Sequence, residues 1–183
     1  MTPSDRDDRS DEQLVAALNG GDARAFDAIY YRHRDWVVRL ALRFTGRDED
    51  ALDVLQETFA YFFRKFPGFV LTAKLTTFLY PVVRNLSIAA RKRRRREFDE
   101  EELIEPQVPP QAVGGGREEL AAVLKALPGG QREVVLMRFV DDMSLAEIGT
   151  ALGIPEGTVK SRLHNALKAL RADPRLQAYF LRG

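Results

Sequence analysis

The sequence predicts an all-α protein, built as two small helical domains joined by a flexible linker, with a helix-turn-helix in the C-terminal domain. Apolar residues recur at i, i+3 and i+4 along most of the chain, and no stretch shows the strict alternation of a strand. Residues 97–116 interrupt this pattern with acids, then prolines and glycines, which is the composition of a linker. Residues 144–172 contain two short helical patterns separated by a glycine, which indicates the helix-turn-helix.

Length and composition exclude several classes of protein. The 183 residues allow one domain or two small ones, and the 45% hydrophobic and 30% charged shares are those of a soluble globular chain. No apolar run approaches the ~20 residues that span a bilayer, and the polar N-terminus is not a signal peptide, so we expect a cytoplasmic protein. The absence of cysteine excludes disulfides and thiolate metal sites, and we expect no metal and no cofactor. Because no nucleophile–base pair or phosphate loop is visible, we expect neither enzymatic activity nor a small-molecule substrate.

Charge is distributed unevenly along the chain, although the net charge is only +1. Arg91–Arg96 is a run of six basic residues, and the segment Glu97–Glu105 that follows holds six acids. A basic run of this kind either neutralises nucleic-acid phosphates or is simply a solvated surface.

Two helices are predicted at the start of the chain. Residues 1–9 are expected to be disordered. Ser10 is expected to cap a short helix, and Asp22 to cap a long one that Gly46 ends. His33 lies on the apolar stripe of the long helix, so we expect a packed core histidine rather than a catalytic or metal-binding one.

A third and a fourth helix complete the N-terminal domain. The third is predicted over 47–66, where Pro67-Gly68 breaks it. The fourth is predicted to start near Thr76 or Thr77 and to run to about Arg96, with Pro81 inside it at the cost of one backbone hydrogen bond. The predicted buried sides are Ala51, Leu55, Phe59, Phe62 and Phe66 in the third helix, and Phe78, Leu79, Val82, Leu86 and Ala90 in the fourth.

The C-terminal domain is predicted to contain four helices. The first carries the stripe that begins at Leu120, and a Pro128-Gly129-Gly130 turn separates it from a helix over Gln131–Val140. The helix-turn-helix follows, and Asp173-Pro174 ends its second helix. The last residues are expected to add a short turn that packs Tyr179 and Phe180.

Local chemistry specifies the helix-turn-helix. Ser144 and Glu147 have the spacing of a capping box, and Gly153 is expected to take the left-handed conformation that ends the first helix. Pro155 suits the start of the second helix. Gly157, close behind it, would let the backbone approach a phosphate.

The polar face of the second helix carries side chains that read base edges and bind phosphates. These are Glu156, Thr158, Lys160, Ser161, Arg162, His164, Asn165 and Lys168. The alternative interpretation is an ordinary amphipathic helix pair with a solvated polar face. Because the cap, the turn and the polar face agree, the sequence favours DNA binding.

Three stretches, in this order, resemble the bacterial RNA polymerase sigma factors of the extracytoplasmic-function (ECF) type. They are DALDVLQETFAYFFRKF (Asp50–Phe66), TTFLYPVVRNLSIAARKRRRR (Thr76–Arg96) and LPGGQREVVLMRFVDDMSLAEIGTALGIPEGTVKSRLHNALKALR (Leu127–Arg171). They are similar, respectively, to the family's segment that binds the clamp helices of the polymerase largest subunit, to its promoter-melting helix and to its minus-35-reading domain. The resemblance implies core RNA polymerase, promoter DNA and an anti-sigma factor as partners.

The resemblance also implies a division of the chain and a set of contact residues. Residues 1–96 would be sigma domain 2, for polymerase binding, minus-10 recognition and melting, 97–116 the linker, 117–175 sigma domain 4, and 176–183 a tail. Gln131 and Arg132 would join the minus-35 contacts. The implied minus-10 contacts are Lys74, Thr76, Thr77, Tyr80, Arg84, Asn85, Arg91, Arg93 and Arg94, and the implied polymerase contacts are Asp50, Asp53, Gln56 and Glu57.

The chain departs from the family pattern at three positions. Phe78 stands where tryptophan is usual, Ala89 where aspartate is common, and Pro81 is not the usual residue. Phe78 keeps a ring that could stack on a base, although a core role is the simpler interpretation. These departures bear on promoter preference.

Two other functions remain open on the residues alone. One is a stand-alone helix-turn-helix regulator, although residues 1–96 show no ligand-site motif that such a protein would use as a sensor. The other is an interaction protein that titrates the polymerase or an anti-sigma factor without opening DNA. Dependence of promoter binding and transcription on core polymerase separates these classes.

The adjacent charge runs generate a first prediction. If the acids of Glu97–Glu105 fold back on Arg91–Arg96, they compete with DNA in the free protein. Replacing those acids by their amides should then strengthen non-specific DNA binding in the absence of polymerase, as measured at low salt by fluorescence anisotropy. Unchanged affinity would show that the acids do not compete.

Overall fold

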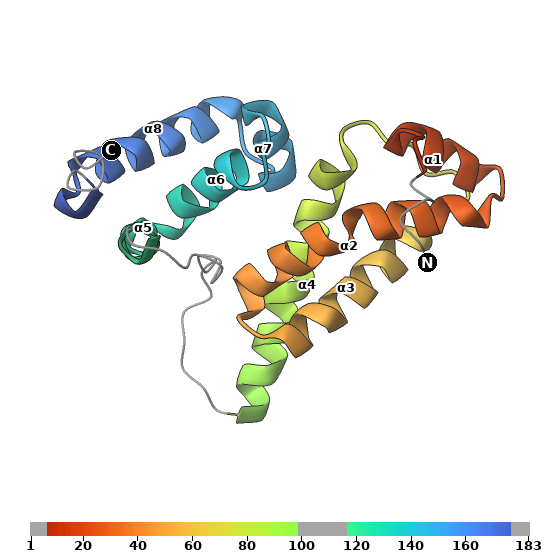
Figure 1. Cartoon of the computed structure of the whole chain (residues 1–183), viewed down its shortest axis with the longest axis horizontal. Coiled ribbons are helices and arrows are strands. Elements are labelled where there is room, and N and C mark those ends of the chain that lie inside the picture. Colours follow the sequence, from red (N-terminus) through yellow and green to blue (C-terminus); the bar gives the residue numbers. More distant parts are fainter. Residues whose placement is uncertain (1–6, 99–116, 177–183) are drawn as a thin grey trace. The chain divides into compact units, whose positions relative to one another are not determined.

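The computed structural model describes residues 7–98 and 117–176, and the chain forms two compact units (Figure 1). All regular structure in the described ranges is helical, as predicted. The first unit holds α1 (Asp11–Asn19), α2 (Ala23–Thr45), α3 (Asp48–Phe63) and α4 (Leu75–Phe98), and the second holds α5 (Arg117–Ala126), α6 (Gly129–Phe139), α7 (Leu145–Leu152) and α8 (Glu156–Ala172). Residues 99–116 of the predicted linker lie outside the described ranges.

The first unit is built on three helices that share one core. α2, α3 and α4 each contact the other two, and α1 packs on α2. Leu14 from α1, Ile29 and Leu40 from α2, Phe62 from α3 and Leu79 from α4 are fully buried. This core holds the outer faces of α3 and α4 in fixed positions, because interior side chains pack too closely to let a helix rotate.

Local signals set the boundaries of α1 and α2, as predicted. Ser10 forms a capping box with Gln13 at the start of α1. The Asp22 carboxylate accepts a backbone N–H of the first turn of α2. Gly46 ends α2 in the left-handed conformation, with a φ of 73°, where a side chain would be strained.

The boundary between α3 and α4 lies earlier than predicted. α3 ends at Phe63 instead of Phe66, because the chain tightens there into i→i+3 hydrogen bonds ahead of Pro67. α4 begins at Leu75 and contains Pro81 in its interior, as predicted.

The buried stripe of α4 is rotated slightly from the predicted one. Leu79 and Ala90 are buried as expected, but Val83 is fully buried where Val82 was predicted, and Val82 and Leu86 are half-buried. α4 contacts both α2 and α3, so its buried face is wider than one amphipathic stripe.

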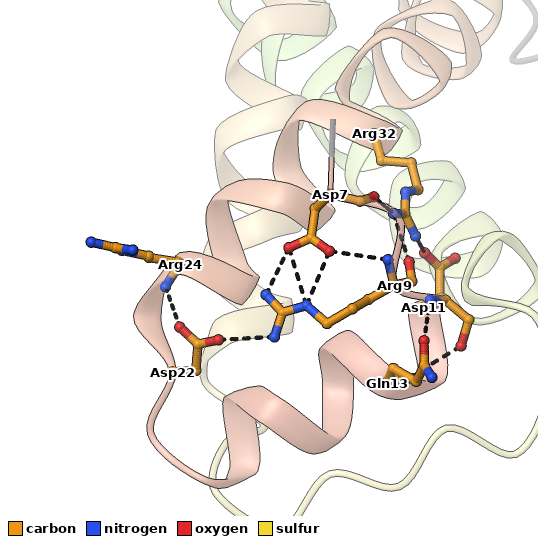
Figure 2. A network of polar contacts seen from close by, with 8 residues as sticks. Asp7, Arg9, Asp11, Gln13, Asp22, Arg24 and Arg32 are labelled. Atoms are coloured by element: carbon orange, nitrogen blue, oxygen red, sulfur yellow. Dashed lines mark hydrogen bonds and ion pairs between the residues drawn. The ribbon is translucent and has the colours of Figure 1, made fainter. Parts of the chain in front are cut away.

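An arginine orders the start of the chain, where residues 7–9 are structured rather than disordered (Figure 2). The Arg9 guanidinium lies between two carboxylates, with Nη2 2.7 Å from Asp7 Oδ2 and Nη1 3.0 Å from Asp22 Oδ2. The hydrogen bonds from Arg9 lower the pKa of the Asp7 carboxyl to about 2. Residues 1–6 lie outside the described ranges.

A second set of polar contacts fastens α1 to α2. Arg32 donates to Asp11 Oδ1 at 2.8 Å and to the carbonyl oxygens of Asp7 and Arg9 at 2.7 and 2.8 Å (Figure 2). His33 is buried as predicted, and its Nε2 also lies 2.9 Å from Asp11 Oδ2. Burial alone raises the pKa of Asp11, but the hydrogen bond with His33, the charge on that ring when protonated and Arg32 outweigh burial, so the pKa lies below its ordinary value.

The second unit packs α5 and α6 against α8, with α7 closing the helix-turn-helix. Leu124, Leu127, Val135 and Ala166 form a buried cluster, against which Leu163 and other half-buried residues of α8 pack. α6 begins at Gly129, slightly earlier than the predicted Gln131. Asp173 caps the end of α8 as predicted, while Tyr179 and Phe180 lie outside the described residues.

The turn between α7 and α8 follows the predicted chemistry. Ser144 Oγ accepts the Glu147 N–H at 3.2 Å, and Glu147 Oε2 accepts the Ser144 N–H at 2.7 Å. Gly153 is left-handed, with a φ of 65°. Gly149 adds a constraint that the sequence analysis did not identify, since a Cβ there would lie 3.0 Å from the carbonyl oxygen of Ile154. The two helices therefore meet through backbone contact at this glycine.

Arg132 serves the fold, which corrects its prediction as a DNA contact. Its side chain is only 3% exposed. Nε donates to the Leu124 carbonyl at 2.9 Å, and Nη2 donates to the carbonyls of Lys125 and Leu127. The Leu124 and Lys125 carbonyls lie in the last turn of α5 and the Leu127 carbonyl just after it, where few helical N–H groups remain to satisfy them, although the Leu124 carbonyl also accepts the Leu127 N–H. Arg132 therefore joins the end of α5 to α6.

Replacing Arg132 should destabilise the second unit. Arg132→Leu leaves three carbonyls at the end of α5 without this donor, and we expect a loss of about 2–4 kcal/mol in the free energy of unfolding. Denaturant unfolding followed by helical circular dichroism measures it. Lys125→Ala, at an exposed position of α5, should change stability by less than about 0.5 kcal/mol. Equal stability of both variants would contradict the buried role of Arg132.

The packing of α1 on α2 should weaken at low pH. The folded pKa of Asp11 is lowered from 3.8, so this carboxylate stabilises the docked helix above about pH 4, and the contribution is lost as the pH falls through the folded pKa. NMR chemical shifts of the α1 amides, followed from pH 7 to pH 2, should report this release before the core unfolds. Asp11→Asn should reduce the pH dependence, while Asp7, Glu12 and Asp22, whose pKa values are also lowered, still titrate in this range. A titration identical to that of the unaltered chain would contradict the role of Asp11 in holding α1 on α2.

Candidate nucleic-acid interface

α8 presents the predicted reading residues on the face opposite its core contacts. Val159 and Ala166 are fully buried, and Leu163 packs against the core cluster. The exposed predicted residues are Glu156, Lys160, Ser161, His164, Asn165 and Lys168, while Thr158 and Arg162 are half-buried at its edges. The structure therefore brings the predicted reading residues of α8 together on one surface.

Short contacts order several of these side chains. Lys160 Nζ lies 2.8 Å from Glu156 Oε1, one helical turn away. Ser161 Oγ donates to the Thr158 carbonyl at 3.0 Å. Arg162 lies over the first turn of α6, since a Cβ at Gly130 would come within 3.3 Å of its Nη1.

The start of α8 leaves room for a phosphate. The N-cap residue, Pro155, makes no side-chain capping bond to the first amides. A Cβ at Gly157 would meet no atom within 4 Å, so this side of the first turn is open. Gln131, which was predicted as a neighbouring DNA contact, is half-buried in the first turn of α6.

The basic run at the end of α4 divides into anchored and exposed residues. Arg91 Nη1 donates to the Phe44 carbonyl at 3.3 Å, close to the end of α2. Arg94 Nη1 lies 3.7 Å from Asp50 Oδ2 on α3. The exposed residues of the run are Lys92, Arg93, Arg95 and Arg96. Two of the predicted DNA contacts thus also join α4 to the other helices.

The residues predicted to contact the melted minus-10 strand also divide into exposed and buried ones. Lys74 and Asn85 are exposed, and Thr76 and Arg84 are half-buried. Thr77 and Tyr80 are 3% and 1% exposed, which corrects their prediction as contacts to a DNA strand. Both face the core, because α4 buries a wide face against α2 and α3.

Phe78 belongs to an aromatic cluster, in keeping with its predicted core role. Its ring centroid lies 4.8 Å from that of Phe69, 6.2 Å from Phe62 and 6.4 Å from Tyr61. Phe66 completes the cluster through edge contacts with Phe62 and Phe69. The cluster ties the loop after α3 to the first turn of α4.

The predicted polymerase contacts lie on α3. Asp53, Gln56 and Glu57 are exposed, while Asp50 is half-buried beside Arg94. Two apolar side chains of the same helix that were not predicted as part of this surface, Leu52 and Phe63, are 50% and 54% exposed. Both lie off the predicted buried stripe of the third helix, and this position could have indicated that they are exposed.

Other kinds of site find no support in the described ranges. There, no group of three His, Asp or Glu side chains lies close enough to hold a metal ion. No helix in those ranges has both the length and the apolar character to cross a membrane.

Two family models match the two units. Sigma-70 region 2 matches residues 29–97, and sigma-70 region 4 matches residues 117–170. The first match covers most of α2, all of α3 and nearly all of α4, and the second covers α5, α6, α7 and most of α8. Each match therefore includes the surface described in its unit.

Curated proteins and solved structures resemble nearly the whole chain. The ECF RNA polymerase sigma factor SigL of Mycobacterium tuberculosis is 34% identical over 164 residues, which cover 86% of this chain and 93% of the relative. SigW of Bacillus subtilis, named likewise, is 29% identical over 180 residues, which cover 90% and 96%.

Two solved structures share the fold. CnrH, in complex with the cytosolic domain of CnrY, gives a TM-score of 0.65 at 24% identity over 88% of this chain and 95% of that one. The sigma factor RpoE of Bartonella quintana, in complex with the anti-sigma factor NepR, gives 0.63 at 21% over 82% and 99%. The relatives and the two region matches together establish that this chain belongs to the ECF family of RNA polymerase sigma factors.

Proposed function

We propose that this chain binds core RNA polymerase and directs it to promoters, with the α8 face reading the minus-35 element and the surface of α4 and its preceding loop engaging the minus-10 element. Family membership supports the activity. The observation that carries the residue assignment is the exposed polar face of α8, which a helix-turn-helix holds away from the core. We assign residues 117–175 to minus-35 recognition and residues 1–96 to polymerase binding and minus-10 opening.

In the minus-35 interaction, α8 would lie in the major groove. His164 and Asn165 carry short polar groups suited to base edges, and Asn165 can pair with adenine through two hydrogen bonds. Lys160 and Lys168 would bind phosphates on either side, and these contacts set the register without reading sequence. The open side of Gly157 would face the backbone at the start of the helix.

In the minus-10 interaction, the exposed and half-buried residues at the start of α4 would hold one separated strand. Lys74, Thr76, Arg84 and Asn85 offer donors to bases and phosphates, whereas Thr77 and Tyr80 support the helix from within. Unstacking a base costs a few kcal/mol, which these contacts must offset. Exposed arginines such as Arg93 would neutralise upstream phosphates.

Polymerase binding would use the outer face of α3. Asp53, Gln56 and Glu57 would face basic groups on the polymerase, and these charges would set orientation and association rate more than affinity. Leu52 and Phe63 would add apolar contact area beside them.

Regulation by an anti-sigma factor, in the cytoplasm, completes the proposal. NepR, the partner of the Bartonella quintana relative, is named an anti-sigma factor, and CnrH was solved with the cytosolic domain of CnrY. The fold that this chain shares with both proteins supports the same kind of regulation here. A stand-alone helix-turn-helix regulator is the alternative, and no feature of the described surfaces favours it.

The decisive experiment is transcription in vitro from a promoter library with purified core polymerase. We expect transcripts only when the chain and the core enzyme are both present, with enrichment of one minus-35 and one minus-10 sequence. Sequence-specific binding that neither needs nor recruits the core enzyme would instead establish the stand-alone regulator.

Two substitutions on α8 should weaken promoter binding in different ways. Asn165→Ala should cost about 1–3 kcal/mol in promoter binding by the holoenzyme and relax the preference at one base pair. Lys168→Ala should weaken binding to all sequences and reduce the slope of log K against log salt by about 0.9. Lys125→Ala, at an exposed lysine of α5, is the matched control and should leave both properties unchanged. If Asn165→Ala left the base preference unchanged at every position of the promoter, Asn165 would not read a base.

A further inference from the structure

The last residue of α1 holds the loop that precedes α4. Asn19 Oδ1 accepts the Gly68 N–H at 2.7 Å, and Asn19 Nδ2 donates to the Phe69 carbonyl at 2.8 Å. One amide side chain thus binds two consecutive backbone groups of a segment about fifty positions along the chain, since the sequence separations are 49 and 50 residues. Because one side chain makes both bonds, it fixes the orientation of that backbone as well as its distance.

The loop before α4 is also held at Gly68 and Phe69 by its own backbone conformation and by the aromatic cluster. Gly68 has a φ of 99°, a conformation that residues with side chains rarely adopt, so the chain turns sharply there. The ring of Phe69 lies in the aromatic cluster, with its centroid 5.6 Å from Phe62 and 4.8 Å from Phe78. Asn19 holds the backbone on the outside, and the cluster holds the ring on the inside.

The residues that follow lie between two fixed points. The second fixed point is the start of α4, where the Lys74 carbonyl accepts the N–H groups of Thr77 and Phe78 at 3.0 and 3.2 Å. Between them, Val70 is 72% exposed, and Thr72 and Lys74 are exposed as well. The position of this short segment therefore depends on where Phe69 is held.

α1 is itself fastened firmly enough to act as a support. Leu14, Val15 and Leu18 are buried against the first unit. The contacts of Asp11 with Arg32 and His33 fix the other end of the helix to α2. A tie at Asn19 therefore connects the loop to the three-helix core.

We propose that Asn19 is a positioning residue for promoter opening: it holds residues 69–74 in the place where the separated minus-10 strand binds. The proposal rests on the proposed function, which places Lys74 and Thr76 on that strand. It extends that function to α1, which lies before residue 29, where the match to sigma-70 region 2 begins. A loop already held in its bound position pays less ordering entropy when the strand arrives.

The competing explanation is that the Phe69 ring alone positions the loop, with Asn19 as an incidental surface contact. Both explanations keep the protein folded when Asn19 is replaced, because its side chain is exposed. They differ in what happens to DNA opening and to the exchange of the Gly68 amide.

The test uses the full chain with core polymerase and a promoter that carries a fluorescent base analogue in the non-template minus-10 strand. Stopped-flow fluorescence separates the binding constant of the closed complex from the rate of opening. Asn19→Ala should slow opening roughly fivefold, the effect of losing about two modest hydrogen bonds, and leave closed-complex binding and core association within about twofold. It should also reduce discrimination among minus-10 bases. Ala16→Asn places the same amide at an exposed position one turn earlier in α1 and should behave as the unaltered chain.

Hydrogen exchange of the free protein supplies a readout that does not depend on polymerase. In Asn19→Ala the Gly68 amide should exchange about fivefold faster, while amides within α1 keep their protection. Unchanged Gly68 exchange and an unchanged opening rate in Asn19→Ala would overturn the proposal. Equal losses in core association, closed-complex binding and opening would also overturn it, because they would show that Asn19 only stabilises the fold. If the unaltered chain never supports transcription with core polymerase, the proposed function fails, whatever the exchange data show for Asn19.

Discussion

Burial of one face along each described helix is the constraint on which the rest of this structure depends. A residue on the buried face supports the fold and cannot contact DNA. A residue on the opposite face is exposed and can bind a partner. On α8, Val159 and Ala166 occupy the buried face, which leaves Asn165 and Lys168 outside. The burial of each large apolar side chain stabilises the unit by about 1.5–3 kcal/mol, more than a typical surface polar contact contributes, so packing decides which side chains remain to meet a partner.

Features fixed by neighbouring residues could be predicted from the sequence, and features fixed by distant ones could not. The capping box of Ser144 and Glu147 and the left-handed Gly153 involve residues within one turn, and both were predicted. Tyr80 was misassigned because its burial depends on how α4 sits between two other helices. Arg132 was misassigned because its carbonyl partners lie on another helix. The exposure of the polar face of α8 could be predicted, because that face lies opposite an apolar stripe on the same helix.

α4 is both a structural element and a proposed binding surface, and the Arg94–Asp50 pair shows how the two roles coexist. The two side chains are partly exposed and 3.7 Å apart, which is too long for a hydrogen bond. Asp50 Oδ2 is buried and has no hydrogen-bond partner among the described residues, so the nearby Arg94 guanidinium balances its charge. Arg94, proposed to bind phosphate, and Asp50, proposed to contact polymerase, therefore also help to hold α4 against α3.

Gly149, Gly153 and Ser144, which fix the helix-turn-helix, contribute no side chain to the surface that would read DNA. Gly149 allows the backbones of α7 and α8 to approach closely, Gly153 makes the left-handed turn between them, and Ser144 caps the far end of α7. The exposed positions of α8 can thus be exchanged without disturbing the turn. Duplicated copies of such a gene can drift toward different target sequences one substitution at a time, each intermediate still folding, which gives a simple physical route to many regulators from one ancestor.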